Sequence, residues 1–247
     1  MDNMDHVGHM EKVDPVKIEV LFPEVCNLFG DLFNVKYLQR CLPGATRIDT
    51  PLAGEPAFAQ GPVSLLYMGP MSERTQEKAL DRLRPHTRRL AELIEAGTAF
   101  LLTGNAVELF GSYIENEDGS RIQGLGLLPL HAKRDMMHRH NSVFLGDWQG
   151  RAVNGFKSQF TFAWPEEGCQ GLFPVKKGVG LHPGCPYEGL QKGNLFATYL
   201  LGPVLLLNPC LARSLLQAMG AGNASLAFEE AAQAAYQQRL QDFHDKV

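Results

Sequence analysis

Short apolar runs alternate with longer amphipathic stretches along the first hundred residues of the chain. The apolar runs predict buried strands at residues 16–22, 46–49, 63–68 and 99–103. The stretches between them predict helices at residues 27–42, from Ser72 to a break at Pro85, and at 87–96. Strands and helices that alternate in this way form a parallel sheet covered by helices on both faces.

The second half of the chain has a different pattern. Asp-Gly at residues 118–119 is typical of a hairpin turn. Short apolar runs over residues 142–164, separated by Gly or Asp, predict antiparallel strands that flank the main sheet. Asn-Pro at residues 208–209 predicts the start of a helix that ends at Gly220, and Ser225 predicts the start of the last helix.

Length and composition favour one large α/β domain. The chain has 247 residues, of which 45% are hydrophobic, enough for a sizeable core. It contains no internal repeat and no Gly/Ser-rich linker, so we expect a disordered tail over residues 1–15 and a single domain over residues 16–247. The net charge of −4 argues against nucleic acid or an anionic membrane as the main partner.

Cysteine usage and hydropathy indicate where the chain works. Its five cysteines form no CxxC pair, and this odd, scattered set is typical of reduced thiols in the cytoplasm. The first residues lack a basic region followed by an apolar core, so they do not predict a signal peptide. The longest apolar run, residues 200–207, is too short to span a membrane. We therefore expect a cytoplasmic protein.

The elbow segment, residues 101–111, is the most informative part of the sequence. An apolar strand turns into a helix at Gly104, with no cysteine or serine at the bend. Such a turn exposes a side chain above a parallel sheet and points the first N–H groups of the helix at any anion formed there. The segment thus predicts the frame of a nucleophilic site without its reactive atom.

Several motifs together resemble one family. Residues 26–34, Cys-Asn-Leu-Phe-Gly-Asp-Leu-Phe-Asn, are similar to the Asn-Leu-Tyr-Gly-Asp-x-Gly-Asn opening of class I glutamine amidotransferase domains of the cobyric acid synthase type. The likeness is strongest to the glutaminase subunit of lipid II isoglutaminyl synthase, which works beside a Mur-ligase-like subunit. It extends over roughly residues 16–220, through the segments 67–70, 101–111, 124–128, 153–156 and 197–203.

The resemblance implies a fold. It is the class I glutamine amidotransferase-like, flavodoxin-like α/β fold: a mostly parallel sheet with helices on both faces and flanking antiparallel strands. In this family a cysteine attacks the glutamine carboxamide, a histidine transfers protons, and backbone N–H groups hold the oxyanion. By position, the cysteine falls on Gly104 and the histidine on Leu201. The oxyanion donors fall on the backbone of Gly69 and Asn105.

Further departures lie at the same predicted site. Glu108 stands where the family has a glutamine, and Gln159 where the close relative has a histidine. An arginine that the relative uses near its substrate aligns with His138, and Arg139 is one place away. The resemblance therefore implies that glutaminase chemistry has been lost.

Other interpretations remain open at this point. A shift of one residue would make Thr103 the nucleophile, but a threonine hydroxyl needs an adjacent base, and Leu201 provides none. His131, His138 and His140 could share one strand face and bind a metal, yet no carboxylate or cysteine lies at ligand spacing, so surface histidines are favoured. Asp31 and Asn34 could simply cap the first helix.

We therefore predict a degenerate amidotransferase-like protein without cofactor or metal. Its expected role is that of a non-catalytic partner or regulatory subunit of a Mur-ligase-like or other amide-forming synthetase, with a homo-oligomer as an open alternative. The rival hypothesis is an active enzyme. It would be an amidotransferase component of cobyric acid (cobalamin) synthesis or of cell-wall peptidoglycan amidation with an unorthodox nucleophile, or a hydrolase that uses a different residue.

Overall fold

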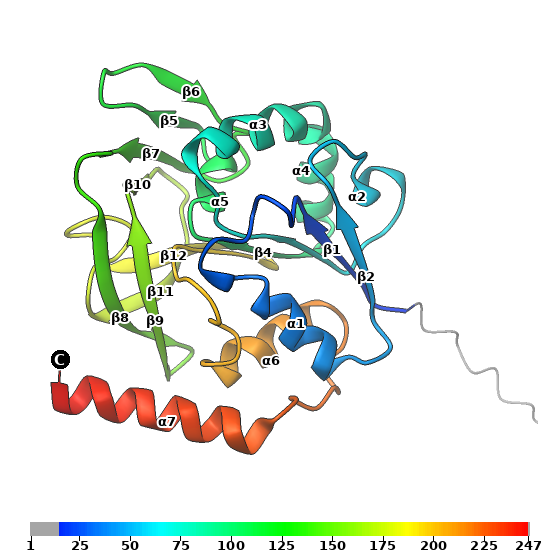
Figure 1. Ribbon diagram of the computed structural model, residues 1–247, viewed down its shortest axis with the longest axis vertical. Helices are drawn as coiled ribbons and strands as arrows, with labels where there is room; N and C mark the ends of the chain where they lie inside the picture. The colour runs from blue at the N-terminus through cyan, green and yellow to red at the C-terminus, as the bar shows by residue number, and fades with distance from the viewer. Residues whose placement is uncertain (1–14, 247) are drawn as a thin grey trace, which may run out of the picture.

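A nine-stranded sheet forms the centre of the computed structural model, which describes residues 15–246 (Figure 1). Its first five strands run parallel in the order β2-β1-β3-β4-β13. They are β2 (Thr46–Thr50), β1 (Lys17–Leu21), β3 (Leu65–Met68), β4 (Ala99–Thr103) and β13 (Leu195–Thr198). All four strands predicted in the first hundred residues are confirmed. The predicted tail lies outside the described residues except for Pro15.

Four antiparallel strands continue this sheet beyond β13. They are β12 (Tyr187–Lys192), β11 (Gly171–Lys177), β8 (His140–Trp148) and β9 (Arg151–Gln159). A second sheet has the order β10-β7-β5-β6, with β10 (Thr161–Pro165), β7 (Leu130–Arg134), β5 (Tyr113–Glu115) and β6 (Arg121–Gln123). The predicted Asp-Gly turn joins β5 to β6 with Gly119 at φ 82°. Most of the predicted antiparallel strands therefore extend the main sheet.

Helices cover both faces of the parallel strands (Figure 1). On one face lie α2 (Ala57–Gln60), α3 (Glu73–Leu83), the 3-10 turn η2 (Arg84–His86), α4 (Thr87–Glu95) and the single turn α5 (Ala106–Leu109). On the other lie α1 (Phe33–Cys41), which follows the 3-10 turn η1 (Leu28–Gly30), and α6 (Pro209–Ala218). The last helix, α7 (Glu229–Lys246), packs beside α6 against the antiparallel strand β9. Side chains of β4 alternate between the two resulting cores: Phe100 and Leu102 enter the first and Leu101 the second.

Helix boundaries agree with the sequence in the middle of the chain and differ at its ends. The Thr75 N–H donates to the Ser72 hydroxyl, 3.3 Å away, at the start of α3. The first helix begins six residues later than predicted, because Phe29, inside η1, is at φ 60° and cannot form part of a right-handed helix. The last helix begins at Glu229 and not at Ser225, because Phe228 is at φ 52° and cannot continue a right-handed helix.

The edge strand β9 is covered by side chains and not by another strand. Asn208 accepts a hydrogen bond from the Asn154 N–H and donates one to the Asn154 carbonyl, both at 2.8 Å. Its side chain makes no cap bond to α6, although the sequence predicts a cap. Tyr236 donates to the Ala152 carbonyl at 2.9 Å. Asn208 thus supplies the donor and acceptor that a neighbouring strand would provide.

No helix within the described part of the chain is both long and apolar enough to cross a membrane.

Candidate functional site

The turn after β4 has the predicted geometry. Gly104 is at φ 57°, a left-handed conformation that glycine adopts at little cost, and its N–H donates to the Thr198 carbonyl at 2.9 Å. A Cβ atom at this position would lie 2.6 Å from Pro70 Cβ and 3.2 Å from Leu201 Cδ2. The space into which a nucleophilic side chain would project is therefore occupied by Pro70 and Leu201.

The helix that follows the turn is shorter than the sequence suggests. Because α5 contains four residues, few peptide dipoles add up at its start, and the expected attraction for an anion is small. Asn105 fixes the turn by other means: its side chain accepts from the Met71 N–H at 2.9 Å and donates to the Met71 carbonyl at 2.8 Å. Asn105 thus clamps the turn to the segment that follows β3.

Asp31 connects three segments at this point, a role that the sequence does not reveal. Its buried carboxylate accepts hydrogen bonds from the hydroxyls of Tyr67 and Thr103. It also accepts from the Gly202 N–H at 2.5 Å. Burial raises the pKa of Asp31, and these hydrogen bonds oppose that rise. The side chain therefore ties β3, β4 and the segment after β13 together, and it does not cap α1, which was the alternative left open by the sequence.

The alternative nucleophile Thr103 lies on the inner side of the turn. Its hydroxyl is fully buried and donates to the Asp31 carboxylate, so an adjacent base exists that the sequence analysis missed. The side chain does not line the neighbouring cavity. A substrate in that cavity would not touch it.

A small cavity, which we name the elbow cavity, lies beside the turn. Its volume is about 180 Å³, below the ~300–1,000 Å³ of sites that enclose larger ligands. It brings together five of the positions predicted from the sequence: Gly104, Asn105, Glu108, Gln159 and Leu201. The rest of its wall comes from η1, residues 70–73, Arg139 and the end of β9 with the start of β10.

Besides Thr103, two of the predicted positions lie outside this wall. Gly69 packs against the main chain, since a Cβ there would lie 2.6 Å from the Cys26 carbonyl oxygen. The side chain of His138 is 82% exposed and pairs with Asp135 at 2.8 Å. Arg139 lines the cavity in its place, with its guanidinium 4.4 Å from the centre of the Phe160 ring. The cavity thus has one cationic side chain on its wall.

Glu108 forms the polar end of the elbow cavity. One carboxylate oxygen accepts from Gln76 at 2.7 Å and the other from Tyr199 at 3.2 Å. The Arg134 guanidinium donates to Gln76 Oε1 at 2.8 Å, to Asn116 at 2.9 Å and to Glu77 at 3.4 Å, and among the described residues no cation forms an ion pair with the Glu108 carboxylate. Complete burial is the largest influence on this group and raises the pKa of Glu108 to about 7.

A buried charge pair lies behind Tyr199. The Lys157 ammonium is 5.4 Å from the centre of the Tyr199 ring and 3.9 Å from Glu188, and it donates to the Gly180 carbonyl at 2.6 Å. Burial lowers the pKa of Lys157 and raises that of Glu188. Lys157 therefore has partners of its own and does not serve as the counter-ion of Glu108.

Gln159 has an unpaired acceptor at the cavity wall. Its amide nitrogen donates to the Thr161 carbonyl at 2.6 Å, and the residue is 7% exposed. Its Oε1 has no hydrogen-bond donor among residues 15–246. A buried amide oxygen without a donor is uncommon in folded proteins.

The elbow cavity holds hydroxyls but no Cys-His pair. Ser72, Ser158 and Thr161 lie on its wall, while no cysteine and no histidine does so within the described chain. Cys26 contacts Met71 instead, with sulfur atoms 3.6 Å apart, and burial raises the pKa of its thiol to about 12. A thiol with so high a pKa stays protonated and is a poor nucleophile.

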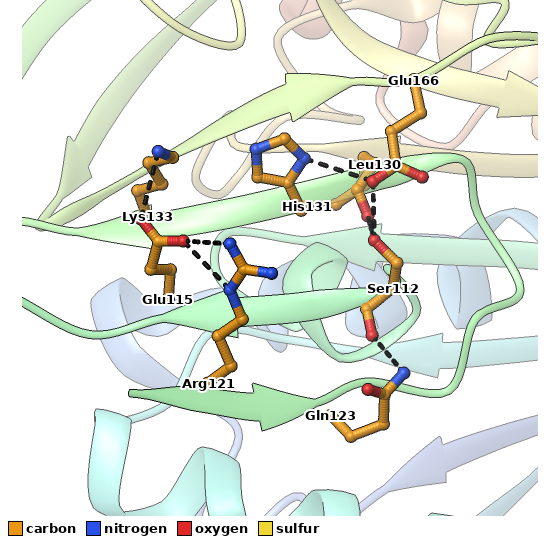
Figure 2. A network of polar contacts seen from close by, with 8 residues as sticks. All are labelled: Ser112, Glu115, Arg121, Gln123, Leu130, His131, Lys133 and Glu166. Carbon is orange, nitrogen blue, oxygen red and sulfur yellow. Dashed lines mark hydrogen bonds and ion pairs between the residues drawn. The ribbon is translucent and has the colours of Figure 1, made fainter. Parts of the chain in front are cut away.

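The histidines considered as metal ligands serve other purposes. Figure 2 shows His131 and the Ser112 hydroxyl both bonded to Glu166, at 3.2 and 2.8 Å. The His131 ring also stacks between Tyr113 and Trp164. No group of three metal-ligating side chains occurs in the part of the chain that the structure describes.

Comparison with solved structures defines the class of fold. The chain resembles a glutamine amidotransferase with a TM-score of 0.56 over 82% of this chain and 98% of that one, at 15% identity. A second glutamine amidotransferase, from Thermotoga maritima, gives 0.51 over 92% and 91%, at 9% identity. The architecture is that of glutamine amidotransferases: an α/β fold around a large mixed sheet.

Sequence comparison identifies particular relatives. The chain is 24% identical over 181 residues to the lipid II isoglutaminyl synthase (glutamine-hydrolyzing) subunit GatD of Staphylococcus aureus (strain N315), over 72% of this chain and 74% of the relative. For GatD of Streptococcus pneumoniae (strain ATCC BAA-255 / R6) the identity is 23% over 210 residues, covering 81% and 79%. The chain is thus homologous to GatD, although no protein-family model matches it.

Proposed function

We propose that this chain is a GatD-like protein that has lost glutamine hydrolysis and serves as a non-catalytic partner or regulatory subunit of an amide-forming synthetase. The names of its relatives place them as subunits of lipid II isoglutaminyl synthase. We infer from this that the chain works in amidation of a cell-wall precursor, beside a Mur-ligase-like subunit.

The geometry at Gly104 carries the proposal. Glutaminase chemistry of this class needs a thiolate that projects from the turn and a histidine that relays its proton. In this chain Gly104 has no side chain at the nucleophile position, and Pro70 and Leu201 fill the space beside it. The proposed loss of glutaminase chemistry therefore involves Pro70, which packs against the turn, as well as the nucleophile position Gly104 and the histidine position Leu201.

Apolar side chains at the cavity mouth support the role of a partner subunit. Leu28 and Phe29 line the elbow cavity and are 44% and 49% exposed. Phe33 and Phe156 are also exposed, the first at the start of α1 and the second on β9. Large apolar side chains gathered near a cleft are typical of protein-interaction surfaces. We propose that this surface contacts the synthetase.

Ammonia release from glutamine tests the loss of chemistry. The purified chain should release no more ammonia than buffer, alone or with its partner. Release that disappears in Thr103→Val would overturn the proposal and establish the shifted nucleophile. Release that persists in that variant would favour a hydrolase built on another hydroxyl of the wall.

Binding to a Mur-ligase-like subunit from the same source tests the partner role. Phe29→Ser should weaken association, while Phe228→Ser, a matched change of an exposed phenylalanine before α7, should leave it unchanged. Equal binding by both variants would show that the proposed surface does not contact the synthetase. Absence of any complex at low salt concentration would contradict the proposal that the partner is a Mur-ligase-like subunit.

A further inference from the structure

A groove lies where the turn between β8 and β9 meets helices α6 and α7 (Figure 1). Two hollows of about 300 and 470 Å³ form this groove, and they adjoin because Arg151, Cys210 and Arg213 line both of them. These volumes fall within the ~300–1,000 Å³ of sites that hold small molecules. We name this place the arginine groove, after Arg151 and Arg213.

The arginine groove is remote from the elbow cavity. Arg151 is the first residue of β9 and Gln159 the last, so a rise of ~3.3 Å per residue places them roughly 26 Å apart along the strand. The described residues that line the groove do not line the elbow cavity. Neither the loss of glutamine hydrolysis nor contact with a synthetase at Phe29 accounts for the groove.

Arg151 brings to the groove a cation that is unpaired among the described residues. Its side chain is exposed, and its guanidinium makes no hydrogen bond or ion pair with any other of residues 15–246. Asp147, the carboxylate four residues before it, pairs with Lys176 at 2.8 Å and accepts from the Gly150 N–H at the same distance. The N–H groups of Arg151 are therefore available to an anion that enters the groove.

Arg213 adds a second cation, from α6. Its side chain is 46% exposed and forms an ion pair with Glu229, which lines the larger hollow only. Among the described residues, the wall of the smaller hollow thus has two arginines and no carboxylate. The amides of Gln149 and Gln217 provide further N–H donors on that wall. This arrangement favours an anion with more than one negative charge and several acceptor oxygens.

We propose that the arginine groove binds the phosphate group of a small soluble phosphate monoester between Arg151 of β9 and Arg213 of α6. Such a phosphate group carries a charge of about −1.5 to −2 near pH 7 and three acceptor oxygens, which match two arginines and their neighbouring amides. Gln149, Ser214 and Gln217 make much of the remaining wall polar, so the rest of the ligand should be hydrophilic.

Calorimetric titration of the purified chain with glycerol 3-phosphate tests the proposal. Binding should saturate at millimolar concentration, and glycerol, which lacks the phosphate group, should bind at least about tenfold more weakly. Arg151→Gln and Arg213→Gln should each weaken glycerol 3-phosphate binding by about tenfold. Arg88→Gln is the matched control, because it removes the same charge from an exposed position of α4, outside the groove, and should change the affinity less than about twofold.

Glu229→Gln should have the opposite effect. It releases Arg213 from an ion pair and removes a negative charge from the groove, so it should tighten glycerol 3-phosphate binding by about threefold. A loss of folding would not produce tighter binding. Arg151→Gln removes no hydrogen bond or ion pair of the described chain, so its effect also reports on the groove and not on stability.

Several results would overturn the proposal. They are equal binding of glycerol and glycerol 3-phosphate, unchanged affinity in Arg151→Gln, and failure of Glu229→Gln to tighten binding. Retention of the chain on phosphatidylglycerol vesicles, without binding of glycerol 3-phosphate, would overturn the assignment to a soluble ligand. Ammonia release and synthetase binding are measured separately, so the proposed function can stand or fall by itself.

Discussion

Replacing Gly104 with alanine adds one methyl group at the point where the lost nucleophile would project. Gly104 is at φ 57°, and the new Cβ would lie 2.6 Å from Pro70 Cβ. Gly193, in the turn between β12 and β13, has the same φ of 57° with no atom within 4 Å of its Cβ position. Gly193→Ala is therefore a control with the same backbone strain and no collision.

The free energies of unfolding of the two variants should differ by the cost of the steric collision at Gly104. Left-handed backbone costs a residue with a side chain ~1–2 kcal/mol, and this cost applies at both positions. The reduced freedom of the unfolded chain also affects both variants and cancels. Forcing an extra methyl into packed surroundings costs ~1–3 kcal/mol and applies only at Gly104. We therefore expect the free energy of unfolding of Gly104→Ala to be lower than that of Gly193→Ala by ~1–3 kcal/mol.

Urea denaturation followed by the fluorescence of Trp148 and Trp164 measures this difference. The midpoint should fall further for Gly104→Ala than for Gly193→Ala, with the slope of the transition unchanged. Equal midpoints would refute the reasoning. They would mean that Pro70 and Leu201 can move aside and that the turn still has room for a reactive side chain.

Three further outcomes follow from the buried polar groups. Burial raises the pKa of Glu108 from its ordinary 4.5 to about 7, so the contribution of the protonated group to stability is complete below pH 4.5 and is lost as the pH rises to 7. The free energy of unfolding of the native chain, relative to that of Glu108→Gln, should therefore fall by ~3 kcal/mol over that range. Stability curves of the two proteins that run parallel with pH would contradict this. Asp31→Asn should lower the free energy of unfolding by ~2–4 kcal/mol, because one amide cannot accept from all three donors of the carboxylate, and a loss below ~1 kcal/mol would count against its linking role. Asn208→Ala should cost ~2–4 kcal/mol in the same assay, since it leaves the Asn154 backbone unpaired, whereas Asn141→Ala, at an exposed position of β8, should cost less than ~0.5 kcal/mol.

The sequence predicted elements best where the local pattern decides the structure. The strand at residues 99–103 and the break at Pro85 are as expected, because a continuous apolar run and a proline act over a few residues. The residues at which the first and last helices begin could not be predicted. They depend on Phe29 and Phe228, which adopt left-handed conformations that phenylalanine rarely takes and that no local sequence pattern signals.

The candidate site could be predicted only in part for a related reason. Motif spacing placed Gly104, Leu201 and Glu108 together, and the elbow cavity contains all three. The partners of Asp31 lie 36, 72 and 171 residues away along the chain, so no sequence periodicity could reveal them. His138 and Arg139 differ by one place, and the direction in which each side chain points decided that Arg139 faces the cavity.

The side-chain amide of Asn208 also hinders the pairing of β9 with a strand from another molecule. A strand from another molecule that approached β9 would have to displace both bonds to Asn154, together with the Tyr236 bond to Ala152. Intermolecular strand addition, the usual first step toward amyloid-like polymers, is therefore blocked along this part of the edge as long as α6 and α7 stay docked. Conditions that detach these two helices should convert a dispersed protein into an aggregating one before the parallel core unfolds.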